Sequence, residues 1–152
     1  MHIFSPDGEK IKTIGGKGAS VRFAVSDIPQ NSIITHNHPR SIGKTGIRAI
    51  GNSFSPADIR SAVLVNAKEI RAVTPTYTFS VKRPDSGWGT NADSVKKYYS
   101  RVNSQVNKEM MSYLNKVGWK EENIARAEVT HFHLVMKKMA KKYGWSYTKK
   151  RG

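Results

Sequence analysis

The stretch that decides the fold is Ser32-Ile33-Ile34-Thr35-His36-Asn37-His38-Pro39, in which a short apolar run ends in two histidines. Its β-branched residues predict a central strand that ends at the histidines. The next clear signal is Ser55-Pro56-Ala57-Asp58, where Ser suits an N-cap, Pro the first helical position and Asp the third. The sequence thus predicts a strand, a loop over residues 40–54 and a helix, with two histidines at a strand end, where sites are often built.

Outward from this stretch, alternation of apolar and polar residues predicts further strands, and a helical period predicts two long helices. The expected strands are residues 1–4, 10–14, 21–25, 69–74 and 76–82, and the expected helices are residues 91–117 and 121–143. We therefore expect an α+β fold: a small mixed β-sheet, one helix after the histidine loop, and a C-terminal two-helix hairpin packed on the sheet. The predicted division is an α+β core over residues 1–90 and a basic helical hairpin over residues 91–152, docked on that core.

The composition excludes several classes of protein. The chain has 152 residues and no cysteine, so disulfides and thiolate metal sites are excluded, and a metal site must use His, Asp or Glu. No run of 18 apolar residues occurs, which excludes a membrane span, and no secretory leader opens the chain. We expect a cytoplasmic protein, encoded by a bacterium or a phage.

The formal net charge of +15 is large for a chain of this size. Seven of the basic residues fall between Lys137 and Arg151, where no acidic residue occurs. Such an excess is typical of proteins that meet a polyanion, so nucleic acid is a candidate partner through the basic C-terminal helices. A solvated helix face with aromatic anchors explains the same pattern, and both interpretations stay open.

Three side chains form the candidate metal site. His36 and His38 leave one strand end, and Asp58 begins the next helix, so two imidazoles and a carboxylate are available to one ion. This donor set with an open fourth position is typical of hydrolytic zinc sites, in which the metal activates a water molecule. Taken alone, Asp58 is better explained as a capping-box acid than as a metal ligand, and Ser55 is better explained as an N-cap.

The sequence His36-Asn37-His38-Pro39 followed by Ser55-x-x-Asp58 resembles the JAB/MPN (JAMM) metalloprotease motif, and its His-Asn-His-Pro form is similar to the RadC-like and phage-associated branches. The resemblance implies zinc bound by His36, His38 and Asp58, with Ser55 stabilising the tetrahedral intermediate. It also implies hydrolysis of a peptide or isopeptide bond in a protein or peptide substrate. It covers residues 1–82 in element order and has no counterpart for the final helices.

The chain departs from this family pattern in two respects. The 20 positions from His38 to Asp58 are about double the usual spacing, and a surface insertion accommodates them at modest entropic cost. The family also uses an upstream Glu as general base. The one upstream candidate is Glu9, beside a predicted turn; otherwise the base would lie ahead of Met1 in a longer parent chain.

Two other functions remain open on the sequence alone. A small nuclease or toxin-type domain would use His36 and His38 as acid–base groups or metal ligands on RNA or DNA. A module without catalysis would only bind nucleic acid. A second His-x-His pair, His131 and His133, falls on a predicted helix, where the two rings point about 200° apart. We expect one of them to be packed and the other exposed.

Overall fold

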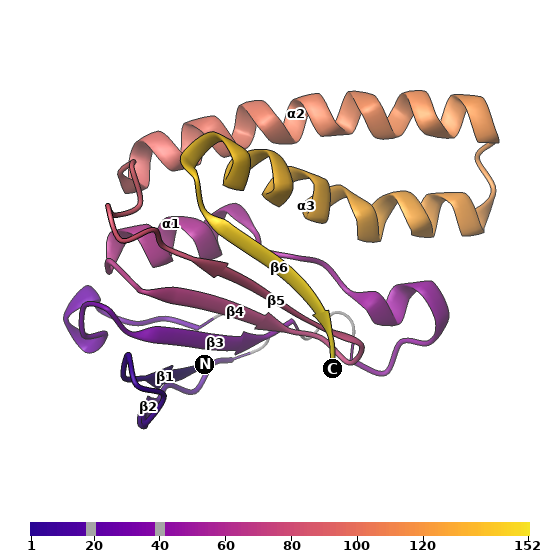
Figure 1. Cartoon of the computed structure of the whole chain (residues 1–152). Helices are drawn as coiled ribbons and strands as arrows, with labels where there is room; N and C mark the ends of the chain where they lie inside the picture. The colour runs from indigo at the N-terminus through magenta and orange to yellow at the C-terminus, as the bar shows by residue number, and fades with distance from the viewer. Residues whose placement is uncertain (18–20, 39–41) are drawn as a thin grey trace.

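The computed structural model describes residues 1–17, 21–38 and 42–152 and confirms the predicted α+β fold (Figure 1). A six-stranded mixed sheet has the order β2-β1-β3-β4-β5-β6, and a two-helix hairpin packs on it. The strands are β1 (His2–Phe4), β2 (Lys10–Thr13), β3 (Ile33–Asn37), β4 (Glu69–Val73), β5 (Tyr77–Lys82) and β6 (Ser146–Arg151). The helices are α1 (Pro56–Leu64), α2 (Ala92–Val117) and α3 (Glu121–Tyr143), with 3-10 helices η1 (Val25–Asp27) and η3 (Gly46–Ile50). Among the described residues, no helix is both long and apolar enough to cross a bilayer.

The one parallel pair of the sheet, β3 with β4, positions the candidate site. Parallel neighbours need a crossover connection, and here η3 and α1 supply it. In such a unit the strand's carboxyl end and the following helix's N-terminus lie at the same edge of the sheet. His36 and Asp58 therefore approach each other although a long loop separates them in the sequence.

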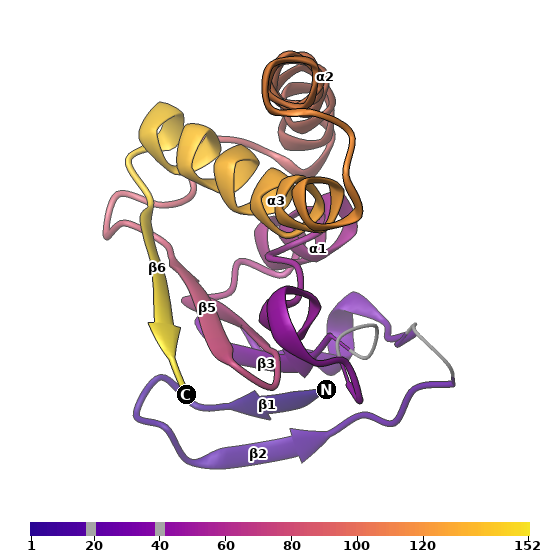
Figure 2. The same ribbon diagram turned by 90° about the vertical axis from the view of Figure 1, so that its right-hand side faces the viewer.

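The core lies between the sheet and the three helices, which all cover the same face (Figure 2). Pairing aligns Ile3, Ile34, Ile70 and Val81 in one row across four strands, each at most 2% exposed. Residues at alternate strand positions face the same side, so this row is the floor on which the helices rest. The helices contribute buried Ile59, Tyr99, Val106, Val135, Met136 and Met139.

Two tryptophans tie the final helices to the sheet. The Trp88 indole N–H donates to the carbonyl of Ala67 at 3.0 Å, and the Trp145 indole N–H donates to the carbonyl of Trp88 at 2.9 Å. Their rings meet edge to face, with centroids 5.1 Å apart. Gly144 ends α3 in the left-handed conformation and turns the chain toward the sheet. Segments far apart in the sequence thus share one buried cluster.

The segment predicted as a strand over residues 21–25 is not one. It is extended but has no ladder partner within the part of the chain that the structure describes, and it ends in η1, where the Asp27 carboxylate accepts a hydrogen bond from the backbone N–H of Ala24. Phe23 packs against the core while Arg22 and Ala24 are exposed. Alternating burial alone therefore produced the strand-like pattern, because a loop that crosses the sheet alternates in the same way.

The structure adds β6, a strand within the residues that the sequence predicts to belong to the basic helical hairpin. It pairs antiparallel with β5 and forms one edge of the sheet. Its sequence, Ser-Tyr-Thr-Lys-Lys-Arg, offers only one aromatic and one β-branched residue, so periodicity gave no clear signal. The sheet therefore draws its outer strand from the C-terminal end of the region predicted to be only a helical hairpin.

The buried carboxylate of Glu69 makes the free energy of unfolding depend on pH. Arg71 donates to both Glu69 oxygens at 2.8 and 3.0 Å, and the Ser80 hydroxyl donates at 2.5 Å. Burial raises the pKa of Glu69, but the hydrogen bonds from Arg71 and Ser80 outweigh burial and lower the pKa below its usual value. A lowered folded-state pKa stabilises the protein above the unfolded pKa, and this stabilisation is lost as the pH falls through the folded pKa.

We expect Glu69→Gln to lower the free energy of unfolding by about 1–3 kcal/mol at pH 7, because it weakens hydrogen bonds to a charged acceptor. The difference from the wild type should shrink as the pH falls below about 4.5, the ordinary pKa of a glutamate, where the carboxylate of the unfolded wild-type chain begins to protonate. Urea unfolding between pH 7 and pH 3 measures both effects. Glu122→Gln, which alters an exposed pair with Arg126, is the control and should cost under about 0.5 kcal/mol. Equal pH profiles for wild type and Glu69→Gln would contradict the assignment.

Candidate metal site

The two histidines share one face at the carboxyl end of β3. His36 lies within the strand, and the backbone N–H of His38 donates to the carbonyl of Val73 at 3.0 Å, which extends the pairing with β4. Residues two apart in a strand point to the same side, so both rings follow Ile34 toward the helices. Their Nε2 atoms are 2.9 Å apart. The strand geometry alone thus aims two imidazole nitrogens at one point.

Asp58 reaches the histidines from the first turn of α1. Its Oδ1 lies 3.3 Å from His36 Nε2, and its Oδ2 lies 3.6 Å from His38 Nε2. Oδ2 also accepts from the backbone N–H and the hydroxyl of Ser55, both at 2.7 Å, while Ser55 Oγ accepts from the Asp58 N–H at 3.2 Å. Asp58 therefore caps the helix and faces the histidines at once, so the two interpretations of this residue are compatible.

The ligand atoms have the separation that a small divalent ion requires. A tetrahedral zinc ion with bonds of about 2.0–2.2 Å would hold its N and O ligands about 3.3–3.6 Å apart. The distances from Asp58 Oδ1 to His36 Nε2 and from Asp58 Oδ2 to His38 Nε2, 3.3 and 3.6 Å, match this range, whereas the two Nε2 atoms, 2.9 Å apart, would separate slightly around an ion. Two imidazole nitrogens this close to each other and to a carboxylate need a proton or a cation among them. Of the described residues, His36, His38 and Asp58 form the one group of such side chains able to hold a metal.

The environment keeps the donor atoms in the state that a metal needs. Burial raises the pKa of the Asp58 carboxyl, but hydrogen bonds with His36, His38 and Ser55 outweigh burial and hold the pKa well below its usual range. Asp58 is therefore ionised at neutral pH. The carbonyl oxygen of Asn52 lies 2.7 Å from His38 Nδ1 and accepts a hydrogen bond from it. That bond fixes the orientation of the His38 ring with Nε2 facing the other ligands, as outer contacts commonly do in metal sites.

The loop that supplies the Asn52 carbonyl is fixed by contacts of Ser53 and Phe54 with the neighbouring elements. Phe54, fully buried, packs its ring against His36 with centroids 6.2 Å apart. The Tyr99 hydroxyl on α2 donates to the carbonyl of Phe54 at 2.9 Å. Ser53 Oγ lies 2.8 Å from the Tyr147 hydroxyl on β6, which also lies 2.8 Å from His133 Nδ1 on α3. The helical hairpin and the last strand therefore fix the loop that orients His38.

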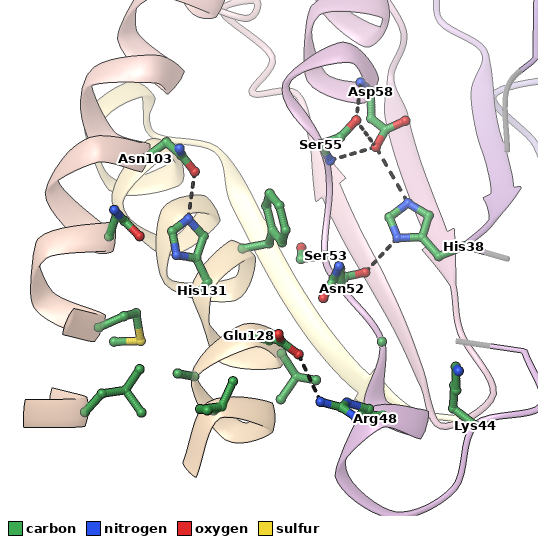
Figure 3. A pocket seen from close by; sticks show the side chains of 18 of the residues that line it. His38, Lys44, Arg48, Asn52, Ser53, Ser55, Asp58, Asn103, Glu128 and His131 are labelled. Carbon is green, nitrogen blue, oxygen red and sulfur yellow. Dashed lines mark hydrogen bonds and ion pairs between the residues drawn. The ribbon is translucent and has the colours of Figure 1, made fainter. Parts of the chain in front are cut away.

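A pocket of about 880 Å³ is lined by all three ligands, of which Figure 3 labels His38 and Asp58. The ligands and the loop of residues 51–55 form one wall, and the hairpin forms the other. Arg48 of η3 lies at its rim, 2.8 Å from Glu121 and 3.6 Å from Glu128. The hairpin wall is largely apolar, from Met110, Met111, Leu114, Ile124, Ala127, Val129 and Phe132. The pocket thus joins a polar end at the candidate metal site to an apolar end at the helices.

The second His-x-His pair does not share a ligand point. His131 Nε2 lies 2.7 Å from Asn103 Oδ1 on α2, inside the pocket, whereas His133 contacts Tyr147 on the other side of α3. The expectation that one would be packed and one exposed is wrong, because both are partly buried. Burial lowers the pKa of both rings. Each histidine instead links α3 to a neighbouring element.

The remaining sequence candidates are placed differently. Ser55 lies beside Asp58, and its hydroxyl proton is directed at the carboxylate. Glu9 is exposed in the turn after β1, where its carbonyl accepts from the N–H of Ser5. Because β1 runs antiparallel to β3 and Phe4 pairs with Ile33, that turn lies at the end of β3 opposite the histidines. The structure therefore brings together His36, His38, Asp58 and Ser55, and it leaves Glu9 outside the group.

Sequence reasoning missed the supporting residues Asn52, Ser53, His133 and Tyr147. Asn52 acts through its backbone carbonyl, which no side-chain pattern reveals. Tyr147 would have been found only by predicting β6, because its register opposite Val81 turns it toward the helices. These contacts depend on which strands pair, and the local sequence does not specify that.

We expect Tyr147→Phe to weaken zinc binding by about tenfold, because loss of the hydroxyl frees Ser53 and the loop that orients His38. It should also lower the free energy of unfolding by about 1–3 kcal/mol, since Ser53 and His133 lose a buried partner. Competition with a zinc chelator and urea unfolding measure the two effects. Tyr113→Phe, a change on α2 away from this loop, is the control. A Tyr147→Phe protein with unchanged zinc affinity would contradict a positioning role.

No family model matches the chain, and comparisons with curated proteins and with solved structures gave no significant match. The chemistry that the site supports follows from its own geometry: two imidazoles and one ionised carboxylate lie together, and one pocket reaches all three.

Proposed function

We propose that the chain is a zinc-dependent hydrolase domain of the JAB/MPN type that cleaves a peptide or isopeptide bond. The observation that carries the proposal is the convergence of His36, His38 and Asp58 at ligand separations, at the polar end of a large pocket. Zinc in such a site would activate a water molecule and polarise the substrate carbonyl. The pattern His-x-His-Pro with Ser-x-x-Asp, which resembles that family, supports the same chemistry.

The residues have distinct roles in this proposal. His36, His38 and Asp58 hold the metal, and the Asn52 carbonyl orients His38. The Ser55 hydroxyl donates a hydrogen bond to Asp58, so it positions that ligand. The same hydroxyl proton is therefore not free to stabilise a developing oxyanion. The groove between the ligands and the hairpin accepts the substrate, with apolar side chains on α2 and α3 available to its apolar groups.

Peptide hydrolysis also needs a group that carries a proton to the leaving amine. Glu9 lies at the far end of β3, so it is not placed for this step. Besides Asp58, the acidic residue that lines the pocket among the described residues is Glu128 on α3. Arg48 lies 3.6 Å from one of its carboxylate oxygens. Glu128 is therefore the candidate for proton transfer in this proposal.

The proposal is tested with a quenched fluorescent peptide library and a lysine-branched isopeptide as probes. We expect hydrolysis that EDTA reduces at least about 10³-fold and that added zinc restores. Glu128→Gln should keep the bound zinc and lose turnover, whereas His36→Ala should lose both. Hydrolysis that survives the chelator, or its absence from zinc-loaded protein on every peptide and isopeptide, would overturn the proposal.

The same assay separates the nuclease alternative. An RNA or DNA oligonucleotide is included as a further probe at equal concentration. Phosphodiester cleavage that is lost in His36→Ala, with no peptide hydrolysis, would assign the pocket to a nuclease. Lys44 and Arg48 line the pocket, and Arg48 is engaged by two glutamates, which favours the peptide substrate over a phosphodiester.

A further inference from the structure

Four basic residues lie on the C-terminal half of α3 and on the edge strand β6, which follows it in the chain. Lys137 and Lys141 lie one turn apart on α3, and both are exposed. Lys149 and Arg151 alternate along β6, on the same side of the strand as Tyr147. We call these four residues the basic ledge. Figure 1 shows α3 turning at its C-terminal end directly into β6, so the helix and the strand that carry these residues are consecutive and adjacent.

The interactions of His133 support this neighbourhood. His133 contacts Tyr147 on β6, and its ring lies 6.4 Å from that of Phe79 on β5. Burial lowers the pKa of His133, and the charges of Lys149 and Lys137 lower it further. Lys137 on the helix and Lys149 on the strand therefore both lie close enough to His133 to lower its pKa, which places them on the same surface.

The charge of the ledge is not neutralised within the part of the chain that the structure describes. The ion pairs there involve none of its four residues, although Lys138, next to the ledge, pairs with Glu109 at 3.0 Å. From Val129 to Gly152 the sequence has no acidic residue. Lysines on an edge strand do oppose aggregation. That function accounts for Lys149 and leaves Lys137 and Lys141 on the helix unexplained.

We infer that the basic ledge of Lys137, Lys141, Lys149 and Arg151 binds the sugar–phosphate backbone of a nucleic acid. Cations that form no ion pair among the described residues attract phosphates by releasing the counterions that surround them. Lys149 also lies over the Tyr77 ring, 4.3 Å from its centroid, and this contact holds its ammonium group at the surface of the ledge. Recognition of this type reads the backbone and carries no sequence preference.

The test measures binding of a fluorescent 20-nucleotide single-stranded RNA, the matching single-stranded DNA and the DNA duplex, each over a range of salt. We expect Kd to rise steeply with salt for the wild type. Replacing all four ledge cations by Gln should weaken binding at least about tenfold. The slope of log Kd against log salt should fall by about 3, as expected for four lost single-strand phosphate contacts. The three probes show whether the ledge prefers RNA, single-stranded DNA or duplex.

A charge-matched control distinguishes binding at the basic ledge from attraction by the net charge of the whole protein. Replacing Lys96, Lys97, Arg101 and Lys108 on α2 by Gln removes the same four charges from another helix. This control should bind within about threefold of the wild type. Equal losses in the two variants, or wild-type binding that salt does not weaken, would overturn the inference. So would binding confined to heparin or to phosphatidylserine vesicles. Circular dichroism checks that both variants fold, and their zinc content is expected to match the wild type.

Discussion

Purified His38→Ala protein is expected to contain no bound zinc, whereas the wild type is expected to contain about one zinc ion per chain after loading. The substitution removes the ligand that the Asn52 carbonyl orients, and it leaves His36 and Asp58 with one donor too few for a tight site. Elemental analysis of protein dialysed against zinc-free buffer measures the stoichiometry. His36→Ala should behave in the same way, because the two Nε2 atoms are adjacent.

His131→Ala provides the matched control for this experiment. His131 lines the same pocket and is partly buried, but it bonds Asn103 and lies outside the ligand group. Its removal should leave the zinc content unchanged. Zinc at 100 times its Kd should also raise the free energy of unfolding of the wild type by about 2.7 kcal/mol, and that of His38→Ala by nothing measurable. Retention of a full equivalent of zinc by both His36→Ala and His38→Ala would show that the three side chains are not a metal site.

The second large effect is expected for Trp145→Ala, which should lower the free energy of unfolding by about 3–5 kcal/mol. Trp145 is 5% exposed, packs against Trp88 and stacks on Tyr143 with centroids 4.8 Å apart. Its loss empties the cluster that joins α3 and β6 to the sheet and leaves the Trp88 carbonyl without its donor. Urea unfolding followed by far-ultraviolet circular dichroism gives the change.

Two comparisons isolate the cause of that loss. Trp145→Phe keeps most of the buried ring and removes the indole N–H, so it should cost less than Trp145→Ala. Trp119→Ala removes the same residue type from a site that is 52% exposed, and it should cost under about 0.5 kcal/mol. If Trp145→Ala unfolded at the same urea concentration as Trp119→Ala, the cluster would not be what anchors the last strand.

The local order of elements was largely predictable because it depends on neighbouring residues. The capping box at Ser55 and Asp58 begins α1 as predicted, Asn91 caps α2, and Gly118 and Gly144 end the two long helices. The central strand ends at the histidines because its β-branched run ends there. Each of these signals acts over a few residues, so the sequence carries it without knowledge of the fold.

Strand pairing was the part that local patterns mispredicted. The segment of residues 21–25 alternates like a strand yet has no partner, whereas Ser146–Arg151 lacks a strong strand pattern yet pairs with β5 along its length. Whether a segment becomes a strand depends on an edge being available elsewhere in the chain. That is a property of the assembled sheet, and β-propensity reports it poorly.

The sequence by itself determined which donor atoms this protein offers: two imidazoles on one strand face and a carboxylate in a helix cap. Only the tertiary structure decided that they meet, because the parallel pairing of β3 with β4 brings the start of α1 to the strand end across 20 positions of chain. It also decided that the Asn52 carbonyl orients His38, that Tyr147 supports that loop, and that Glu9 lies at the other end of the sheet. The physical reason is that helix caps and strand faces form through contacts a few residues apart, whereas a site closes through contacts between distant segments.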